Sequence, residues 1–139
     1  MSQENVERIR RAFEGTTTGD FSYLQDLIDE NCEFQLPPDF PGTQMARGPQ
    51  GFVSVVEEFE EAFEDIRYDP EEFFDQGDRL LVKVRTVGHA KHTRLPVEAT
   101  VYWVYAFREG KVVTMDAHLD RTAALEAVGL SEQDAHTSS

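Results

Sequence analysis

The 139-residue sequence has little that could cross-link it, span a membrane or bind nucleic acid. Its single cysteine, Cys32, excludes an internal disulfide and a thiolate metal site, and we expect it to be a small buried residue at the start of a strand. No apolar run approaches the roughly 20 residues that a membrane span needs. Lysine and arginine total 13 against 27 acids, a formal net charge of −14, so the surface should repel nucleic acid and anionic lipid.

Sequence motifs for cofactors are also missing. The glycines form no phosphate-binding loop, and there is no Walker, dinucleotide or G-x-S-x-G fingerprint, so we predict a protein that uses no cofactor. His89 and His92 have an H-x-x-H spacing, but no carboxylate follows at ligand spacing, and we expect solvated loop histidines and no metal. The first residues are charged and helical in pattern, unlike a signal peptide, which together with the lone cysteine predicts a cytoplasmic protein.

The last third of the chain carries the strongest pattern. Residues 97–108 are dense in β-branched and aromatic side chains, and residues 111–119 alternate between apolar and polar side chains. Both are predicted strands, and Glu109 and Gly110 supply the turn between them.

A short, well-capped helix should follow these strands. Asp120 is a typical N-cap, and Gly129 stands where a left-handed residue ends a helix. Leu130 can then pack back on Leu125, the contact expected of a Schellman ending.

The rest of the chain predicts an α+β domain. Apolar residues at helical spacing indicate three helices, and Pro70 places its strand at an edge or a bulge of the sheet. We expect one domain over residues 1–130 and a disordered tail over 131–139. The expected elements before residue 97 are helices over about 3–14, 21–28 and 49–63, and strands over 32–36, 66–76 and 79–90.

Residues 57–78 are unusually acidic, with eleven acids and one base, Arg67. We interpret this stretch as the solvated face of a helix and an edge strand. The alternatives are adaptation to high salt and recruitment of a basic partner.

The elements described so far include the segments at residues 4–13, 19–20, 32–42, 47–48, 108–113 and 119–130. In their residues and their order, these segments resemble the SnoaL-like, polyketide cyclase-like group of the nuclear transport factor 2-like superfamily. The resemblance implies a cone-shaped fold in which helices pack on the concave face of a curved antiparallel sheet, and it implies a homodimer. Relatives include aldol cyclases, epoxide hydrolases, dehydratases, ketosteroid isomerases and proteins without known activity, so the fold does not select one function.

Asp116 and His118 are the candidate catalytic residues. They stand two apart on a predicted strand, so their side chains leave the same face. If that face is concave, both point into the cone, where Asp116 could act as a general acid or base and His118 as its proton relay. The alternative is that Met115 and its neighbours face the core, and that the pair faces solvent or a partner subunit.

Aromatic residues supply the candidate substrate wall. Trp103 and Tyr105 share one face of residues 97–108 and Tyr102 the other, so this strand should be central and covered on both sides. We expect Tyr102 or Trp103, with Phe34 and Phe40, to contact a substrate, although core packing explains such residues equally well.

Two functions remain in competition. The first is a small-molecule-binding protein that performs cofactor-free acid–base chemistry of the cyclase, isomerase or dehydratase type on a largely apolar substrate. The second is a non-catalytic ligand-binding or dimeric assembly module with the same fold.

Overall fold

Four helices and six strands make up the computed structural model, which describes residues 2–17, 20–37 and 45–131. Most of the tail predicted to be disordered, residues 132–139, lies outside the described residues, as does Phe40. The elements are α1 (Ser2–Thr17), α2 (Ser22–Leu27), β1 (Ile28–Gln35), β2 (Met45–Arg47), α3 (Gly48–Ala62), β3 (Phe63–Gln76), β4 (Arg79–Ala90), β5 (Pro96–Arg108), β6 (Lys111–His118) and α4 (Arg121–Ala127).

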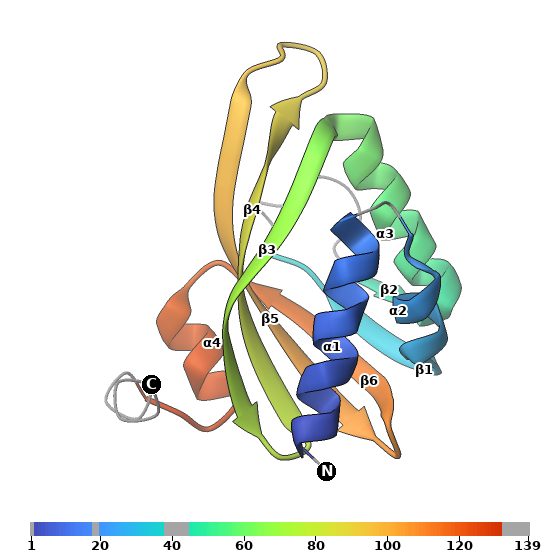
Figure 1. Cartoon of the computed structure of the whole chain (residues 1–139), viewed down its shortest axis with the longest axis vertical. Helices are drawn as coiled ribbons and strands as arrows, with labels where there is room; N and C mark the ends of the chain where they lie inside the picture. Colours follow the sequence, from blue (N-terminus) through green and yellow to red (C-terminus); the bar gives the residue numbers. More distant parts are fainter. Residues whose placement is uncertain (1, 18–19, 38–44, 132–139) are drawn as a thin grey trace.

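The strands form one curved sheet in the order β2-β1-β6-β5-β4-β3 (Figure 1). Every neighbouring pair is antiparallel except β1 and β6, which run parallel, so the sheet is mixed where an antiparallel one was expected. A hairpin forces antiparallel pairing, but β1 and β6 lie far apart in the sequence and no hairpin joins them. Strand β2, three residues long, was not expected, because the sequence predicted no element between residues 36 and 49.

Two cores lie on opposite faces of the sheet. The larger core joins α1, α2 and α3 to the face that carries Trp103, Tyr105 and Met115, which we call the concave face. The smaller core joins α4 to the face that carries Tyr102 and Val104, which we call the convex face. The α+β cone is therefore confirmed, with three helices on the concave face and the fourth outside it (Figure 1).

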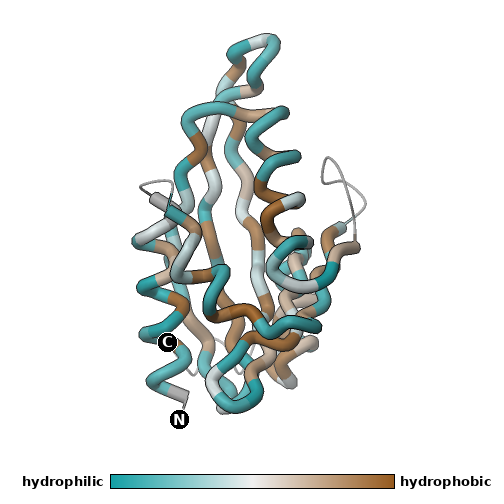
Figure 2. Tube along the Cα trace, turned by 90° about the vertical axis from the view of Figure 1, so that its right-hand side faces the viewer, coloured by the Kyte–Doolittle hydropathy of each residue, from teal (hydrophilic) through white to brown (hydrophobic). Residues whose placement is uncertain are grey.

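Strand β5 is central and buried on both faces, as its sequence predicted. It pairs with β4 on one side and β6 on the other. Residues 101–107 of β5 are buried, apart from the partly buried Ala106. The first five residues of the strand, which form the hairpin with β4, are exposed. The tip of this hairpin is hydrophilic and stands at one end of the molecule (Figure 2).

The caps predicted at both ends of α4 are confirmed. The Asp120 carboxylate accepts a hydrogen bond from the Ala123 amide at 3.2 Å. Gly129 has a φ of +79°, and the Leu130 amide donates to the Leu125 carbonyl at 2.8 Å. Both ends of this seven-residue helix are thus closed by local sequence.

The predicted edge position of Pro70 is also confirmed. Strand β3 is the last strand of the sheet, and its pairing with β4 is irregular between Pro70 and Glu72. Proline has no amide hydrogen to donate, so an edge strand tolerates it where a central strand would lose a hydrogen bond.

Helix boundaries differ from the predictions by a few residues. Helix α1 runs to Thr17, α2 ends before Ile28, and Phe63 opens β3 instead of closing α3. Asp20 stands one residue before the N-cap of α2, and its carboxylate accepts from the Ser22 amide at 3.0 Å. These ends depend on how the helices dock, which local propensity does not encode.

Candidate functional site

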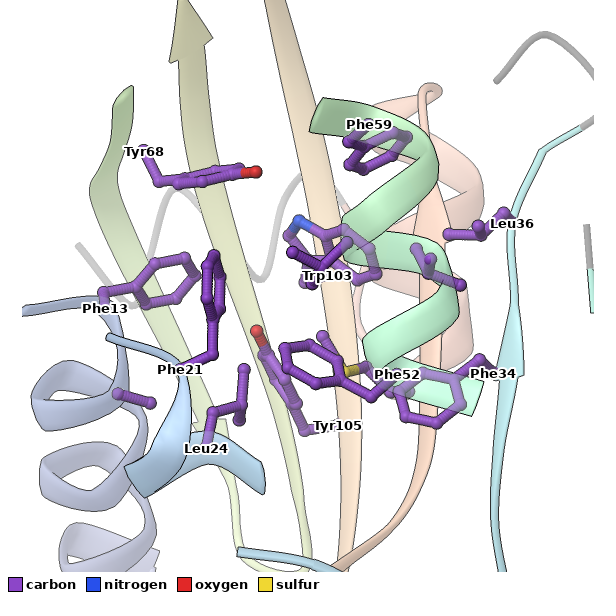
Figure 3. A pocket seen from close by; sticks show the side chains of 14 residues that line it. Phe13, Phe21, Leu24, Phe34, Leu36, Phe52, Phe59, Tyr68, Trp103 and Tyr105 are labelled. Atoms are coloured by element: carbon purple, nitrogen blue, oxygen red, sulfur yellow. The ribbon is translucent and has the colours of Figure 1, made fainter. Parts of the chain in front are cut away.

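A small cavity lies between the helices and the concave face of the sheet. We call it the inner chamber, and its volume is about 60 Å³ (Figure 3). Helices α1, α2 and α3 supply one side of it, and strands β1, β3, β5 and β6 the other. Its lining residues are Ala12, Phe13, Phe21, Leu24, Phe34, Leu36, Phe52, Val55, Val56, Phe59, Tyr68, Trp103, Tyr105 and Met115.

None of these described lining residues carries a charge. The polar groups are the hydroxyls of Tyr68 and Tyr105 and the indole nitrogen of Trp103 (Figure 3). Burial raises the pKa of Tyr68 to about 12, with a smaller contribution from the Glu60 carboxylate, and it raises the pKa of Tyr105 well above its usual range. Both hydroxyls therefore stay protonated at neutral pH, and the chamber offers neutral hydrogen-bond donors.

A second cavity of about 260 Å³ continues from the first toward the β4–β5 hairpin. We call it the outer chamber. Phe59, Tyr68 and Trp103 line both chambers and so form a waist between them. Its lining residues are Phe59, Phe63, Ile66, Tyr68, Thr86, Val87, Gly88, Val97, Glu98, Ala99, Val101, Trp103 and Leu119.

Asp116 and His118 lie on the convex face. Asp116 pairs across the ladder with Val104, and His118 pairs with Tyr102, both members of the smaller core. The structure therefore resolves the two alternatives left by the sequence: Met115 faces the cone, and the polar pair faces away from it. Asp116 and His118 do not line either chamber.

The environment of Asp116 is nevertheless unusual for a surface carboxylate. The residue is half-buried, and this burial raises its pKa. The charges of His118 and Arg79 act in the opposite direction and lower it, while Glu33 adds to the increase. The imidazole of His118 thus acts on the Asp116 carboxyl through space, at a distance from the cone.

The candidate wall residues divide between the two faces. Phe34 and Trp103 line the inner chamber, and Trp103 also lines the outer one. Tyr102 lies in the smaller core beneath α4, so of the two neighbours only Trp103 can touch a molecule in the cone.

The remaining candidates have ordinary structural environments. Cys32 is fully buried, and burial is the main reason that its pKa is raised to about 12, so its thiol is unreactive at neutral pH. The Arg47 guanidinium pairs with the Glu33 carboxylate at 3.2 Å, and both side chains are exposed. His89 lies 3.7 Å from the Asp65 carboxylate, and among the described residues no group of three or more His, Cys, Asp or Glu could hold a metal ion.

Sequence reasoning missed Tyr68 as a cavity residue. It stands in the acidic stretch of β3, where charge dominates the pattern, yet Ile66 and Tyr68 alternate with charged neighbours along the strand. That alternation was the available signal for an inward-facing side chain. Phe52 and Phe59 lie on the apolar side of α3, and the packing of α3 over the sheet makes them cavity walls.

The SnoaL-like domain family matches residues 9–115 of the chain. Among curated proteins, none matches the sequence. None of the described helices is both long and apolar enough to cross a membrane.

Several solved structures share the fold. An NTF2-like (nuclear transport factor 2-like) protein from Burkholderia xenovorans LB400 is 28% identical, with a TM-score of 0.74 over 93% of this chain and 98% of its own. A putative SnoaL-like polyketide cyclase from Jannaschia sp. CCS1 is 16% identical, with a TM-score of 0.74 over 91% and 92%. TerC, co-crystallised with polyporic acid, is 20% identical, with a TM-score of 0.74 over 89% and 97%.

Proposed function

Because the chain belongs to the SnoaL-like domain family, we propose that it binds a small, uncharged, largely apolar molecule within its cone. The observation that carries this proposal is the apolar, aromatic lining of the two connected chambers, which contains few polar groups. Such a lining is typical of small-molecule sites. The crystal structure of TerC with polyporic acid adds support, because a similar fold there accompanies a small molecule.

The polar groups of the waist indicate what such a molecule should carry. The Tyr68 hydroxyl and the Trp103 indole nitrogen are directed toward the space between them (Figure 3). A neutral tyrosine hydroxyl and an indole N–H are both donors. They suit a ketone or ether oxygen, and they offer no positive charge to balance a carboxylate.

Ligand binding can be tested with the intrinsic fluorescence of Trp103, which is the sole tryptophan of the chain. Neutral aromatic compounds of one to three rings, including 1-tetralone, should shift its emission and raise the melting temperature of the protein. Tyr68→Phe should weaken 1-tetralone binding roughly three- to tenfold, the loss of one hydrogen bond. Tyr23→Phe removes a hydroxyl from a ring that stacks under Arg11, outside both chambers, and should change nothing.

The proposal fails if no compound of this set changes either the emission or the melting temperature of the wild-type protein. Equal losses in Tyr68→Phe and Tyr23→Phe would remove the role of the Tyr68 hydroxyl.

Acid–base catalysis by Asp116 and His118 is the second candidate function. The observation in its favour is the raised pKa of Asp116, since general acids and bases work best with a pKa near the working pH. Because the pair lies on the convex face, its substrate would bind there, apart from the cone. Asp116→Asn should then abolish turnover of any compound that the wild-type protein converts while leaving ligand binding in the cone intact. Full activity in that variant would exclude Asp116 as a catalytic acid or base.

The homodimer implied by the resemblance stays a prediction, and we propose that it uses the part of the convex face that α4 leaves uncovered. Met45, on the edge strand β2, is 72% exposed. It pairs with Gln35 of β1, which in turn pairs with Asp116 of β6, so Met45 lies on the convex face. Sedimentation equilibrium gives the mass directly, and a monomer at all concentrations would contradict the prediction.

A further inference from the structure

The two chambers differ in size, and the size of each limits the molecule that it can hold. A cavity of roughly 150 Å³ is large enough to hold benzene in a protein core, and one water occupies about 30 Å³ of liquid. The inner chamber, at about 60 Å³, is therefore too small for an aromatic ring, whereas the outer chamber, at about 260 Å³, has room for two fused rings.

From this difference we infer that the outer chamber is the ligand site and that it takes a neutral molecule of one or two rings, with Trp103 at the waist between it and the inner chamber. This inference rests on the proposed function and makes it more specific. The waist residues are well placed for the role, because Trp103 is only 8% exposed and packs in the larger core. A planar ligand in the outer chamber would lie against its indole ring, an arrangement that aromatic pairs favour.

The lining of the outer chamber explains why the ligand should be uncharged. Among the described residues that line it, Thr86 and Glu98 supply the only polar side chains besides those of the waist. The Glu98 carboxylate already accepts a hydrogen bond from Arg85 at 2.7 Å, and none of the lining residues that the structure describes is a lysine, arginine or histidine. A carboxylate brought into this chamber would lose its hydration without gaining a cation, and it would meet a negatively charged neighbour.

The outer chamber is also accessible without any movement of the core. Its residues on β5, Val97 and Ala99, are exposed, whereas Trp103 at the waist is buried. A molecule can therefore reach the outer chamber from solvent.

Ala99→Phe tests the site because it places a ring in the outer chamber at an exposed position. Thr100→Phe is the matched control: it adds the same ring to the next residue of β5, which pairs with Arg85 on the opposite face. The dissociation constant of 1-tetralone, read from Trp103 emission, should increase at least tenfold in Ala99→Phe and change less than twofold in Thr100→Phe. With the wild-type protein, 2-naphthoate should bind at least tenfold more weakly than 1-tetralone.

A variant that fills the other chamber separates the two sites. Val56 lines the inner chamber from α3 and is only partly buried, so Val56→Phe should fold and leave the affinity for 1-tetralone within about threefold. Loss of binding in Val56→Phe with retention in Ala99→Phe would place the ligand in the inner chamber and overturn the inference, while the proposed function would stand. If Ala99→Phe does not fold, Ala99→Leu serves the same purpose, with a smaller expected loss of about threefold. Equal affinity for 2-naphthoate and 1-tetralone would overturn the inference that the ligand is uncharged.

Discussion

Asp116 shows how the position of one residue changes its chemistry. On the convex face it is half-buried beside His118, and burial raises its carboxyl pKa above the ordinary 3.8. In the unfolded chain the pKa returns to that ordinary value. Between the two pKa values the folded protein therefore holds more protons than the unfolded chain, and its stability falls as the pH rises through this window.

Asp116→Asn should remove this pH dependence. We expect the variant to gain stability relative to the wild type when the pH is raised from about 3 to about 7, by less than about 1 kcal/mol because the group is half exposed to solvent. Urea unfolding at the two pH values measures the difference. The exposed Asp26→Asn, on α2, is the control and should show a smaller change. If the difference in unfolding free energy between Asp116→Asn and the wild type is the same at both pH values, the prediction is contradicted.

At the scale of an element, the start of α3 depends on one close approach. Gly48 follows β2 directly and has a φ of +72°. A Cβ atom at this position would lie 2.7 Å from the carbonyl oxygen of Glu30 in β1. Gly77, in the turn between β3 and β4, has nearly the same φ of +77°, but a Cβ atom there would meet nothing within 4 Å.

These two glycines separate conformational strain from steric contact. Gly77→Ala should cost about 1 kcal/mol of unfolding free energy, the strain of a left-handed alanine. Gly48→Ala should cost that amount and also displace α3 from β1, for a total of about 2–4 kcal/mol. Chemical denaturation of both variants gives the comparison. If the two substitutions cost the same, the contact with Glu30 does not constrain α3.

At the scale of the whole molecule, the acidic surface opposes folding. The formal net charge of −14 concentrates like charges when the chain becomes compact. The ion pairs that join β3 to β4, such as Lys83 with Glu71 at 3.7 Å, are partly exposed and stabilise the fold only weakly. Repulsion should therefore dominate the response of the protein to salt.

The denaturation midpoint should rise when sodium chloride is increased from about 0.05 M to about 0.5 M, because the Debye length falls below about 10 Å and screens the repulsion. Thermal melting at a series of salt concentrations measures this. Sucrose solutions of matched osmolality control for general solvent effects. A midpoint that is flat, or that falls as exposed ion pairs weaken, would exclude adaptation of this surface to high salt.

Much of the fold could be predicted because its signals are local. The cap at Asp120, the left-handed Gly129 and the proline at the edge of the sheet each depend on a few neighbouring residues, and the structure confirms them. The two covered faces of β5 follow from its apolar composition. Strand β2 and the parallel pairing of β1 with β6 depend on segments distant in sequence, which local patterns do not report.

By itself, the sequence determined which residues share a face: Asp116 with His118, and Trp103 with Tyr105. The two-residue period of a strand requires this in any fold. Only the tertiary structure decided which of these faces is concave, because the period separates two faces without saying which one the helices will cover. The same packing placed Tyr68 beside Trp103 and divided the cone into two chambers, since a cavity is the space left between elements that meet only in the folded chain.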